Sequence, residues 1–321
     1  MAVLGAPPPD LKCRPIQESD WDKVVDCLRR GFPMRSRNYW KHALTRLSQR
    51  PAVDDFPRYG FALETSGRIV GVVLTLYARY QGGEIRCNIS SWSVDAAFRP
   101  YAMKLIWPVL KRRDVTYTNI SPAPSTLNAN KALGFRLFAS GQFAFLPALS
   151  PAQPSCRVLE VRSDLAEMAM LSDSERYILL EHAALGGLSL IGIRDEMAFP
   201  LVLRSRRILH GLVPCSQIVY CRSLTDLSRC AGAMGRFILR RGTLLCLVDA
   251  NEPVPGLLGR YFPRKGLKYF KGPKTAFARR PDVHRTGDIR SLKVSLAARP
   301  LPPPSHASAF PARHRRAAGR N

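Results

Sequence analysis

The chain has 321 residues, of which 46% are hydrophobic and 23% are charged, and its formal net charge is +25. The apolar content is that of a folded protein with buried cores and excludes a wholly disordered chain. No apolar run approaches the ~18 residues that a membrane-spanning helix needs, and the proline-rich opening does not resemble a signal peptide. We therefore expect about two domains in a cytoplasmic protein.

The positive charge gathers toward the carboxyl end. Residues 261–321 contain 15 Lys/Arg and 2 Asp/Glu, a net charge of +13. Residues 298–321 are rich in Pro, Ala and Arg without an apolar period, which predicts a disordered basic tail. Such a tail can contact nucleic acid, but more often it keeps a protein soluble, so nucleic acid is the less favoured partner.

In the first part of the chain, residues 11–16 predict a short strand. Two helices, each with one apolar face, follow at residues 18–32 and 37–47. A hairpin is predicted for residues 59–64 and 68–80, which are joined by Ser66-Gly67. Residues 85–94 predict a fourth strand. Pro100 then suits the first turn of a helix that continues to about residue 110.

A strand at 115–120, a helix at 125–134 and a strand at 142–149 complete the first half. The composition then changes to Pro and Ser, which marks a domain boundary. The expected divisions are a flexible start at 1–10, a first domain at 11–148, a linker at 149–155, a second domain at 156–297 and the tail at 298–321.

The second half repeats the order of the first. We expect a strand at 156–161, helical material at 163–185, a hairpin at 187–205, a strand at 216–223, a helix at 224–242 and a strand at 243–251. This order predicts an internal duplication. The small residues inside the last helix, which include Gly232 and Gly235, indicate close packing more than a phosphate site.

The eight cysteines are scattered, without a CxxC pair and without a histidine at metal-ligand spacing from them. This pattern favours reduced thiols and argues against a zinc site.

The first half resembles the GNAT superfamily of N-acetyltransferases over residues 11–147. The resemblance lies in the element order, the long strand RIVGVVLTLY, the segment VDAAFRPYAMKL and the closing LGFR. It implies an α/β (α+β) fold with a mixed, mostly antiparallel central sheet flanked by helices, here duplicated with a degenerate second copy. It also implies acetyl-CoA as cosubstrate, an amine acceptor and no metal.

In that superfamily a strand ends in Arg or Gln, two residues, Gly, one residue, and Gly or Ala. The backbone N–H groups of this turn hold the pyrophosphate of acetyl-CoA, as helix N-termini hold anions generally. Here Ala102 takes the place of the first glycine and Lys104 that of the second small residue, where its ammonium can reach a phosphate. The residues expected to bind the cosubstrate are Val94, Arg99, Pro100, Tyr101, Ala102, Met103 and Lys104.

The chemistry implied by the resemblance is direct attack of an amine on the thioester. Glu84 and Asp95, at the two ends of the fourth strand, are the candidate bases, with turn or capping carboxylates as the alternative. The superfamily often protonates the departing thiolate with a Tyr from the helix before the closing Gly-Phe. This chain has no Tyr there, so the acid is unassigned and water can serve.

Other side chains of the first half are candidates for the pocket. Cys87, Asn88, Ser90 and Trp92 alternate along the fourth strand, so one of its faces is expected to line the pocket. Cys87 is either a nucleophile or, more commonly, a buried structural thiol. Arg30, Arg35, Arg37 and Lys41 suit an acceptor with an acidic group, unless they lie on a solvated helix face.

Three hypotheses follow. The leading one is an N-acetyltransferase acting through residues 11–148. The second is a catalytically inactive protein that keeps the GNAT fold for ligand binding or interaction. The third is a basic nucleic-acid-associated factor acting through residues 261–321. The acceptor and the oligomeric state stay open.

Overall fold

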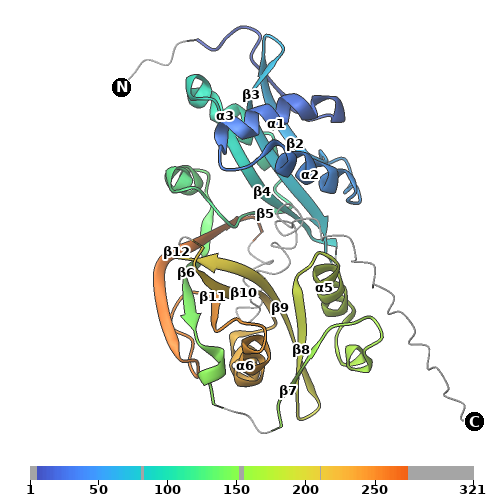
Figure 1. The fold of residues 1–321 in the computed structure, drawn as a ribbon. Helices are drawn as coiled ribbons and strands as arrows, with labels where there is room; N and C mark the ends of the chain where they lie inside the picture. The colour runs from blue at the N-terminus through green and yellow to red at the C-terminus, as the bar shows by residue number, and fades with distance from the viewer. Residues whose placement is uncertain (1–5, 81–82, 152–154, 210, 274–321) are drawn as a thin grey trace, which may run out of the picture.

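The computed structural model describes residues 6–80, 83–151, 155–209 and 211–273. Its twelve strands form one sheet (Figure 1). The first half supplies β1 (Lys12–Pro15), β2 (Gly60–Thr65), β3 (Arg68–Arg79), β4 (Ile85–Val94), β5 (Val115–Asn119) and β6 (Arg136–Phe145). The second half supplies β7 (Arg157–Glu160), β8 (Leu188–Arg194), β9 (Met197–Ile208), β10 (Val213–Cys221), β11 (Leu245–Ala250) and β12 (Gly259–Lys271).

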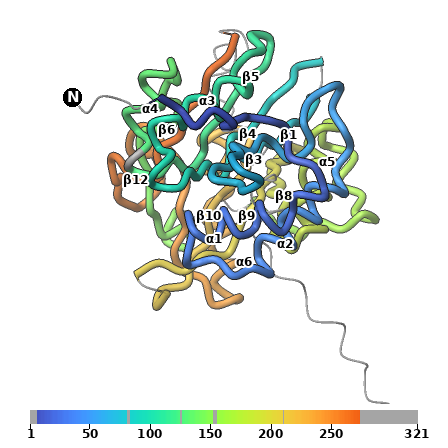
Figure 2. The backbone as a smooth tube through the Cα atoms, turned by 90° about the horizontal axis from the view of Figure 1, so that it is seen from above, coloured from blue at the N-terminus to red at the C-terminus, as the bar shows by residue number. Residues whose placement is uncertain are grey.

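Helices cover both faces of this sheet. They are α1 (Trp21–Gly31), α2 (Arg37–Ser48), α3 (Ala102–Ile106), α4 (Leu127–Ala132), α5 (Asp173–Ala184) and α6 (Leu224–Leu239). Around β3 and β4, α1 and α2 lie on one side while α3 and α4 lie on the other (Figure 2). One apolar core joins α1 and α2 to residues such as Leu74 and Leu76 of β3. A second core joins Leu105 and Ile106 of α3 to Tyr117 of β5.

The two halves exchange strands at the centre of the sheet. The strand order is β1-β2-β3-β4-β5-β12-β6-β11-β10-β9-β8-β7. The last strand of the second half therefore lies between β5 and β6 of the first, and β6 lies next to β11 of the second (Figure 1). In the described sheet, β6 reaches the rest of the first half through β12, and β12 reaches the rest of the second half through β6.

The pairing pattern repeats across this exchange. Neighbouring strands run antiparallel except for two pairs, β4 with β5 and β10 with β11. In each half a hairpin precedes the parallel pair, and helical turns connect its two strands. The mixed, mostly antiparallel sheet flanked by helices confirms the predicted fold class.

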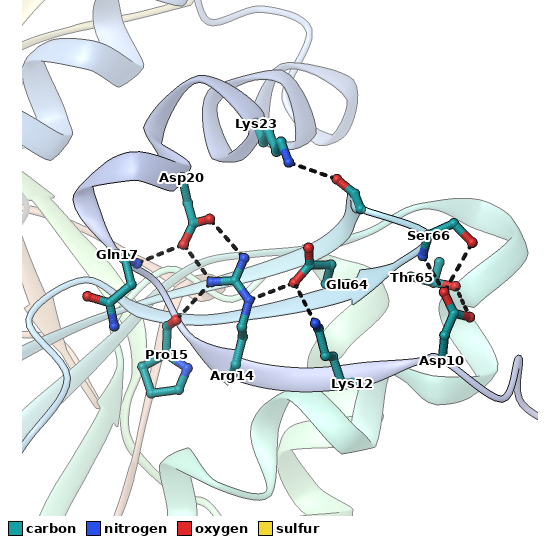
Figure 3. A network of polar contacts seen from close by, with 11 residues as sticks. Asp10, Lys12, Arg14, Pro15, Gln17, Asp20, Lys23, Glu64, Thr65 and Ser66 are labelled. Carbon is teal, nitrogen blue, oxygen red and sulfur yellow. Dashed lines mark hydrogen bonds and ion pairs between the residues drawn. The ribbon is translucent and has the colours of Figure 1, made fainter.

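The outer edge at β1 is held by an ionic network (Figure 3). The Arg14 guanidinium donates from Nε to Glu64 on β2 at 2.6 Å, and from Nη1 and Nη2 to Asp20 at 2.6 and 2.8 Å. Asp10 accepts a hydrogen bond from the Thr65 hydroxyl at 2.7 Å. A four-residue edge strand is thereby tied to the hairpin and to the start of α1.

Three sequence-based expectations need correction. The helix expected from Pro100 is broken: residues Ala96–Tyr101 form a 3₁₀ helix with Pro100 inside it, and α3 covers only five residues. Pro100 fits either helix type because only its φ angle is fixed. The last strand of the first half begins at Arg136, earlier than expected. The long strand β12 was not expected at all.

The small residues of α6 pack as predicted. A Cβ atom on Gly235 would lie 2.1 Å from the backbone nitrogen of Ala148 and 2.3 Å from the carbonyl carbon of Pro147. Only glycine lets the helix approach the turn Pro147–Leu149 so closely.

The domain limits stay a prediction, and residues 298–321 lie outside the described residues. None of the described helices is both long and apolar enough to cross a membrane.

Candidate functional site

The candidate site begins where β4 and β5 separate. These strands pair only from Ile85↔Val115 to Asn88↔Thr118, although β4 continues to Val94. On its other side β4 stays paired with β3, but the register shifts between Val72 and Leu74. Ser91 has a φ of +52°, which marks a β-bulge there. The second half of β4 thus turns away from β5 and carries backbone groups on that side with no partner strand in the described sheet.

Neutral polar side chains lie at the last β4–β5 pair on the α1/α2 face. Asn88, Thr116 and Thr118 are exposed by 1%, 0% and 0%. The Thr118 hydroxyl is 3.4 Å from Asn88 Oδ1, which accepts from it. Asn88 Nδ2 and Thr116 Oγ1 have no hydrogen-bond partner in the described chain. The sequence pattern had placed Asn88 on a possible pocket face.

A second amide pair lies at the same level on the opposite face. Asn119, the last residue of β5, donates from Nδ2 to Asn130 Oδ1 on α4 at 3.3 Å. Asn130 is 2% exposed, and its Nδ2 has no partner in the described chain. The resemblance to GNAT proteins places a Tyr in this helix; the buried polar side chain here is Asn130. Local pattern does not identify Asn130, because a single Asn in a short helix carries no periodic signal.

The residues expected to bind the cosubstrate are contiguous with the end of β4. The amide of Phe98 donates to Asp95 O at 2.9 Å and that of Ala102 donates to Arg99 O, so both are used within the 3₁₀ turn. Arg99 and Lys104 are exposed, and their side chains make no hydrogen bond or ion pair with any described residue. The side chains of Arg99 and Lys104 are therefore available here for an anion, whereas the Phe98 and Ala102 amides are not.

The other residues expected to bind the cosubstrate lie in or next to the same segment. Val94, Tyr101 and Ala102 are half-buried, Pro100 is exposed, and Met103 is 43% exposed. Their role in binding stays a prediction.

The candidate base Asp95 is held by two guanidinium groups. Arg30 of α1 donates from Nε and Nη2 to its two oxygens at 3.0 and 2.9 Å, and Arg68 donates from Nη2 at 3.0 Å. Ionic hydrogen bonds of this kind are shorter and stronger than neutral ones. Asp95 therefore joins α1 and β3 to the end of β4. This is a structural role and not that of a base.

Glu84, the other candidate base, is bound in the same manner at the opposite end of β4. Arg86 donates from Nε and Nη2 to its two oxygens at 2.9 and 2.8 Å. The ten residues of β4 lie between Glu84 and Asp95, so at about 3.3 Å per residue their backbones are roughly 35 Å apart along the strand. The structure does not bring Glu84 and Asp95 together, so they do not form one acid–base pair.

Cys87 has the environment of a structural thiol. It is completely buried in the core beneath α3, and this burial raises the pKa of its thiol. A nucleophilic cysteine needs the opposite shift.

The four basic residues that were candidates for an acidic acceptor have partners within the chain. Arg30 binds Asp95, while Arg37 and Lys41 form ion pairs with Asp22. The Arg35 guanidinium lies 4.7 Å from the centre of the Tyr39 ring. These contacts do not favour an acidic acceptor at this helix pair. Among the described residues, no group of three or more His, Cys, Asp or Glu side chains could hold a metal ion.

Sequence comparison gives no relatives: no protein-family model matches the chain, and no curated protein matches it. Solved structures do. A GCN5-related N-acetyltransferase from Anabaena variabilis has a TM-score of 0.54 at 10% identity, covering 81% of this chain and 72% of that chain. One from Kribbella flavida has a TM-score of 0.53 at 13% identity, covering 81% of this chain and 70% of that chain.

A third similar structure is the GCN5-related glucosamine N-acetyltransferase region of a fungal multi-domain β-N-acetylglucosaminidase. Its TM-score is 0.56 at 10% identity, covering 82% of this chain and 38% of that chain. Each match covers more than 80% of this chain and therefore includes parts of both halves. The chain therefore has the fold of the GCN5-related N-acetyltransferases.

Proposed function

We propose that the chain is an acyltransferase that moves an acetyl group from acetyl-CoA to an amine, and that its site lies in residues 11–148. The observation that carries this proposal is the separation of β4 from β5 beside the exposed cations Arg99 and Lys104. This geometry offers unpaired strand backbone, buried donors and positive charge along one path.

The residues present fit such a cosubstrate. Arg99 and Lys104 provide charge for phosphates, and the second half of β4 offers backbone hydrogen-bonding groups. Asn88 and Asn130 offer buried amide groups whose Nδ2 atoms have no hydrogen-bond partner among the described residues. The 3₁₀ turn departs from the superfamily pattern, because its Phe98 and Ala102 amides are already bonded. Side-chain charge would therefore carry most of the phosphate binding.

Acetyl-CoA supplies an activated thioester when it is bound. The chain's part is to hold the acceptor amine and the thioester together, since proximity supplies much of the acceleration. Asp95 and Glu84 are bound to guanidinium groups. We therefore assign the acceptance of the amine proton to water and not to either carboxylate. The acceptor is a neutral or basic amine, because the helix cations expected to bind an acidic group are already paired.

The test is calorimetric titration of acetyl-CoA into the wild-type chain and two charge-matched double variants. Arg99→Glu/Lys104→Glu should weaken binding at least about tenfold, which corresponds to about 1.4 kcal/mol. Lys111→Glu/Arg113→Glu changes the same charge at exposed residues just beyond α3 and should have a much smaller effect. Absence of saturable binding to the folded wild type would overturn the proposal.

A second function is favoured by one observation: both candidate carboxylates are held by arginines. A protein that binds a ligand on the GNAT fold without turnover needs no base. Release of CoA from acetyl-CoA, measured against a panel of polyamines, aminosugars and lysine peptides, separates the two functions. Saturable binding without CoA release from any amine would favour the ligand-binding protein.

A further inference from the structure

The strand β12 has a free edge along its first part. It pairs with β6 on one side from Gly259 onward, but with β5 on the other side only over its last three residues, Tyr269 to Lys271. Residues from Gly259 to Gly266 are exposed except for the half-buried Tyr261, and this part of β12 follows the outer margin of the molecule (Figure 1). In the described sheet, the side of β12 that faces away from β6 therefore has no partner strand before Tyr269.

The register shows which backbone groups point to this free edge. The Leu146 amide donates to the Leu258 carbonyl at 3.0 Å, and the same register continues to Pro263. Because hydrogen-bonded and non-hydrogen-bonded pairs alternate in an antiparallel ladder, Gly259, Tyr261 and Pro263 direct their backbone groups away from β6. Pro263 thus costs the ladder no hydrogen bond, as expected of a proline at an edge. Two N–H and three C=O groups are left for another strand.

The side chains along this edge present a cation between two apolar groups. Leu258, Arg260 and Phe262 alternate with the outward residues and lie on the face opposite Tyr261, which packs against the core beneath α6. Leu258 and Phe262 are 58% and 39% exposed. The Arg260 guanidinium lies 5.5 Å from the centre of the Phe262 ring, which holds its charge along the strand.

The charge of the edge has one sign. Residues 259–271 contain five Lys/Arg and no Asp/Glu. Arg260, Arg264 and Lys265 are exposed, and their side chains make no hydrogen bond or ion pair with a described residue. Like charges on facing strands are destabilising, so a second copy of this edge is disfavoured as the partner. A strand that carries acidic side chains is favoured.

We propose that the free edge of β12 binds an extended acidic segment of a partner protein, which adds an antiparallel strand beside Gly259–Pro263. In this mode backbone hydrogen bonds supply affinity, and contacts of alternate side chains supply specificity. The residue opposite Arg260 is acidic, those opposite Leu258 and Phe262 are apolar, and further acidic residues meet the two cations that follow. The surface uses none of the residues of the proposed acetyl-CoA site, so it stands apart from acetyl transfer.

The test is fluorescence anisotropy of a labelled peptide titrated with the full chain. The peptide has a central Glu, a Val two positions away on each side, Thr between them and an Asp-Glu pair at its amino end. Saturable binding is expected. Methylation of both Thr backbone nitrogens removes the N–H groups opposite Gly259 and Tyr261 at unchanged charge, and should weaken binding about tenfold. Methylation of the central Glu nitrogen, which points away from β12, is the matched control and should have a much smaller effect.

Charge variants and hydrogen exchange locate the bound peptide. Arg264→Glu/Lys265→Glu should weaken binding about tenfold. Lys111→Glu/Arg113→Glu makes the same charge change at exposed residues beyond α3 and should not. Exchange of the two amide protons that point to the free edge should slow when the peptide binds.

Two outcomes would overturn the inference. Absence of saturable binding to the wild type would show that the cations only protect the edge from other strands. Equal binding of the two methylated peptides would show a surface that attracts polyanions, such as nucleic acid, by charge alone.

Discussion

Arg30 and Asp95 form a two-point contact between the first helix and the end of β4. The Arg30 Nε and Nη2 atoms lie 3.0 and 2.9 Å from the two carboxylate oxygens, and Nη2 also donates to the Ile69 carbonyl on β3 at 2.9 Å. One guanidinium therefore fixes α1, β3 and β4 at the point where the chain turns toward Arg99. Its geometry makes Asp95 a structural residue.

Replacing this arginine should destabilise the fold. Arg30→Ala leaves Asp95, whose side chain is 15% exposed, with Arg68 as its remaining ion-pair partner among the described residues. We expect the free energy of unfolding to fall by about 1–3 kcal/mol in urea titrations. Arg37→Ala is the control, because its partners Asp22 and Asp26 are 71% and 51% exposed and exposed pairs contribute about 0–1 kcal/mol. Equal losses in the two variants would contradict this reading.

The network around Arg14 should make stability depend on acidic pH. Hydrogen bonds from Arg14 lower the pKa of Asp20 and of Glu64 below their ordinary values of 3.8 and 4.5. A carboxylate whose pKa is lowered in the folded state stabilises the fold above its unfolded pKa, and this stabilisation is lost as the pH falls below it. Thermal unfolding should thus show a loss of stability that begins below about pH 5.

Arg14→Gln isolates this contribution. The variant should melt below the wild type at pH 7. The difference should shrink at pH 3, because the carboxylates of the unfolded chain are protonated there and must lose their protons when the wild type folds. Arg162→Gln removes an exposed pair with Asp164, with side chains 74% and 72% exposed, and should change neither melting curve. A constant difference between Arg14→Gln and the wild type at both pH values would show that these carboxylates do not titrate with folding.

The buried ion pair at the strand exchange offers a double-variant test. Lys268 of β12 and Asp249 of β11 are 0% and 1% exposed, form an ion pair, and lie on either side of β6. Lys268→Met removes the cation that is paired with the buried Asp249 carboxylate, which keeps its hydrogen bond from Gln142 Nε2 at 3.1 Å, and should cost about 3–5 kcal/mol. Lys268→Met/Asp249→Leu removes both charges and should recover much of that loss in urea unfolding. A double variant no more stable than the single one would contradict a charge-based explanation.

The glycines of α6 should tolerate no side chain. Gly235→Ala places a methyl group 2.1 Å from the Ala148 nitrogen, so the helix must move away from the turn at Pro147–Leu149. We expect a loss of at least about 2 kcal/mol, although alanine is the better helix former. Gly232→Ala, with nearest atoms at 2.9 Å, should cost less. The reverse order in thermal unfolding would contradict the packing described.

Local pattern was sufficient for much of the fold. Residues 85–94 alternate clearly between turn signals, and β4 has those bounds. β12 was missed because it contains Pro263, Gly266 and several cations, and only its last residues are buried. It becomes a strand through pairing with distant partners, which propensity does not record. β12 belongs to the second half but pairs with strands of the first. The residues of neither half alone indicate that pairing.

The candidate site could be predicted only in part, because some of its residues belong to local motifs and others meet only through tertiary packing. Arg99 and Lys104 belong to a contiguous motif, and Asn88 belongs to an alternating strand, so local sequence identified them. Asn119 and Asn130 form their contact through tertiary packing of α4 against β5. The guanidinium partners of Asp95 come from residues distant in the chain, so its structural task was visible only in three dimensions.

The exchange of β6 and β12 has a consequence for synthesis of the chain. Asn119 of β5 pairs with Tyr269 of β12, so the first half stays unfinished until the second half has been translated. At roughly 5–20 residues per second, this leaves an open strand edge on the nascent chain for several seconds or longer. Such an edge can pair with other chains. Folding of this protein should thus be completed only once β12 has been translated, and until then the open edge should make the chain depend on chaperones.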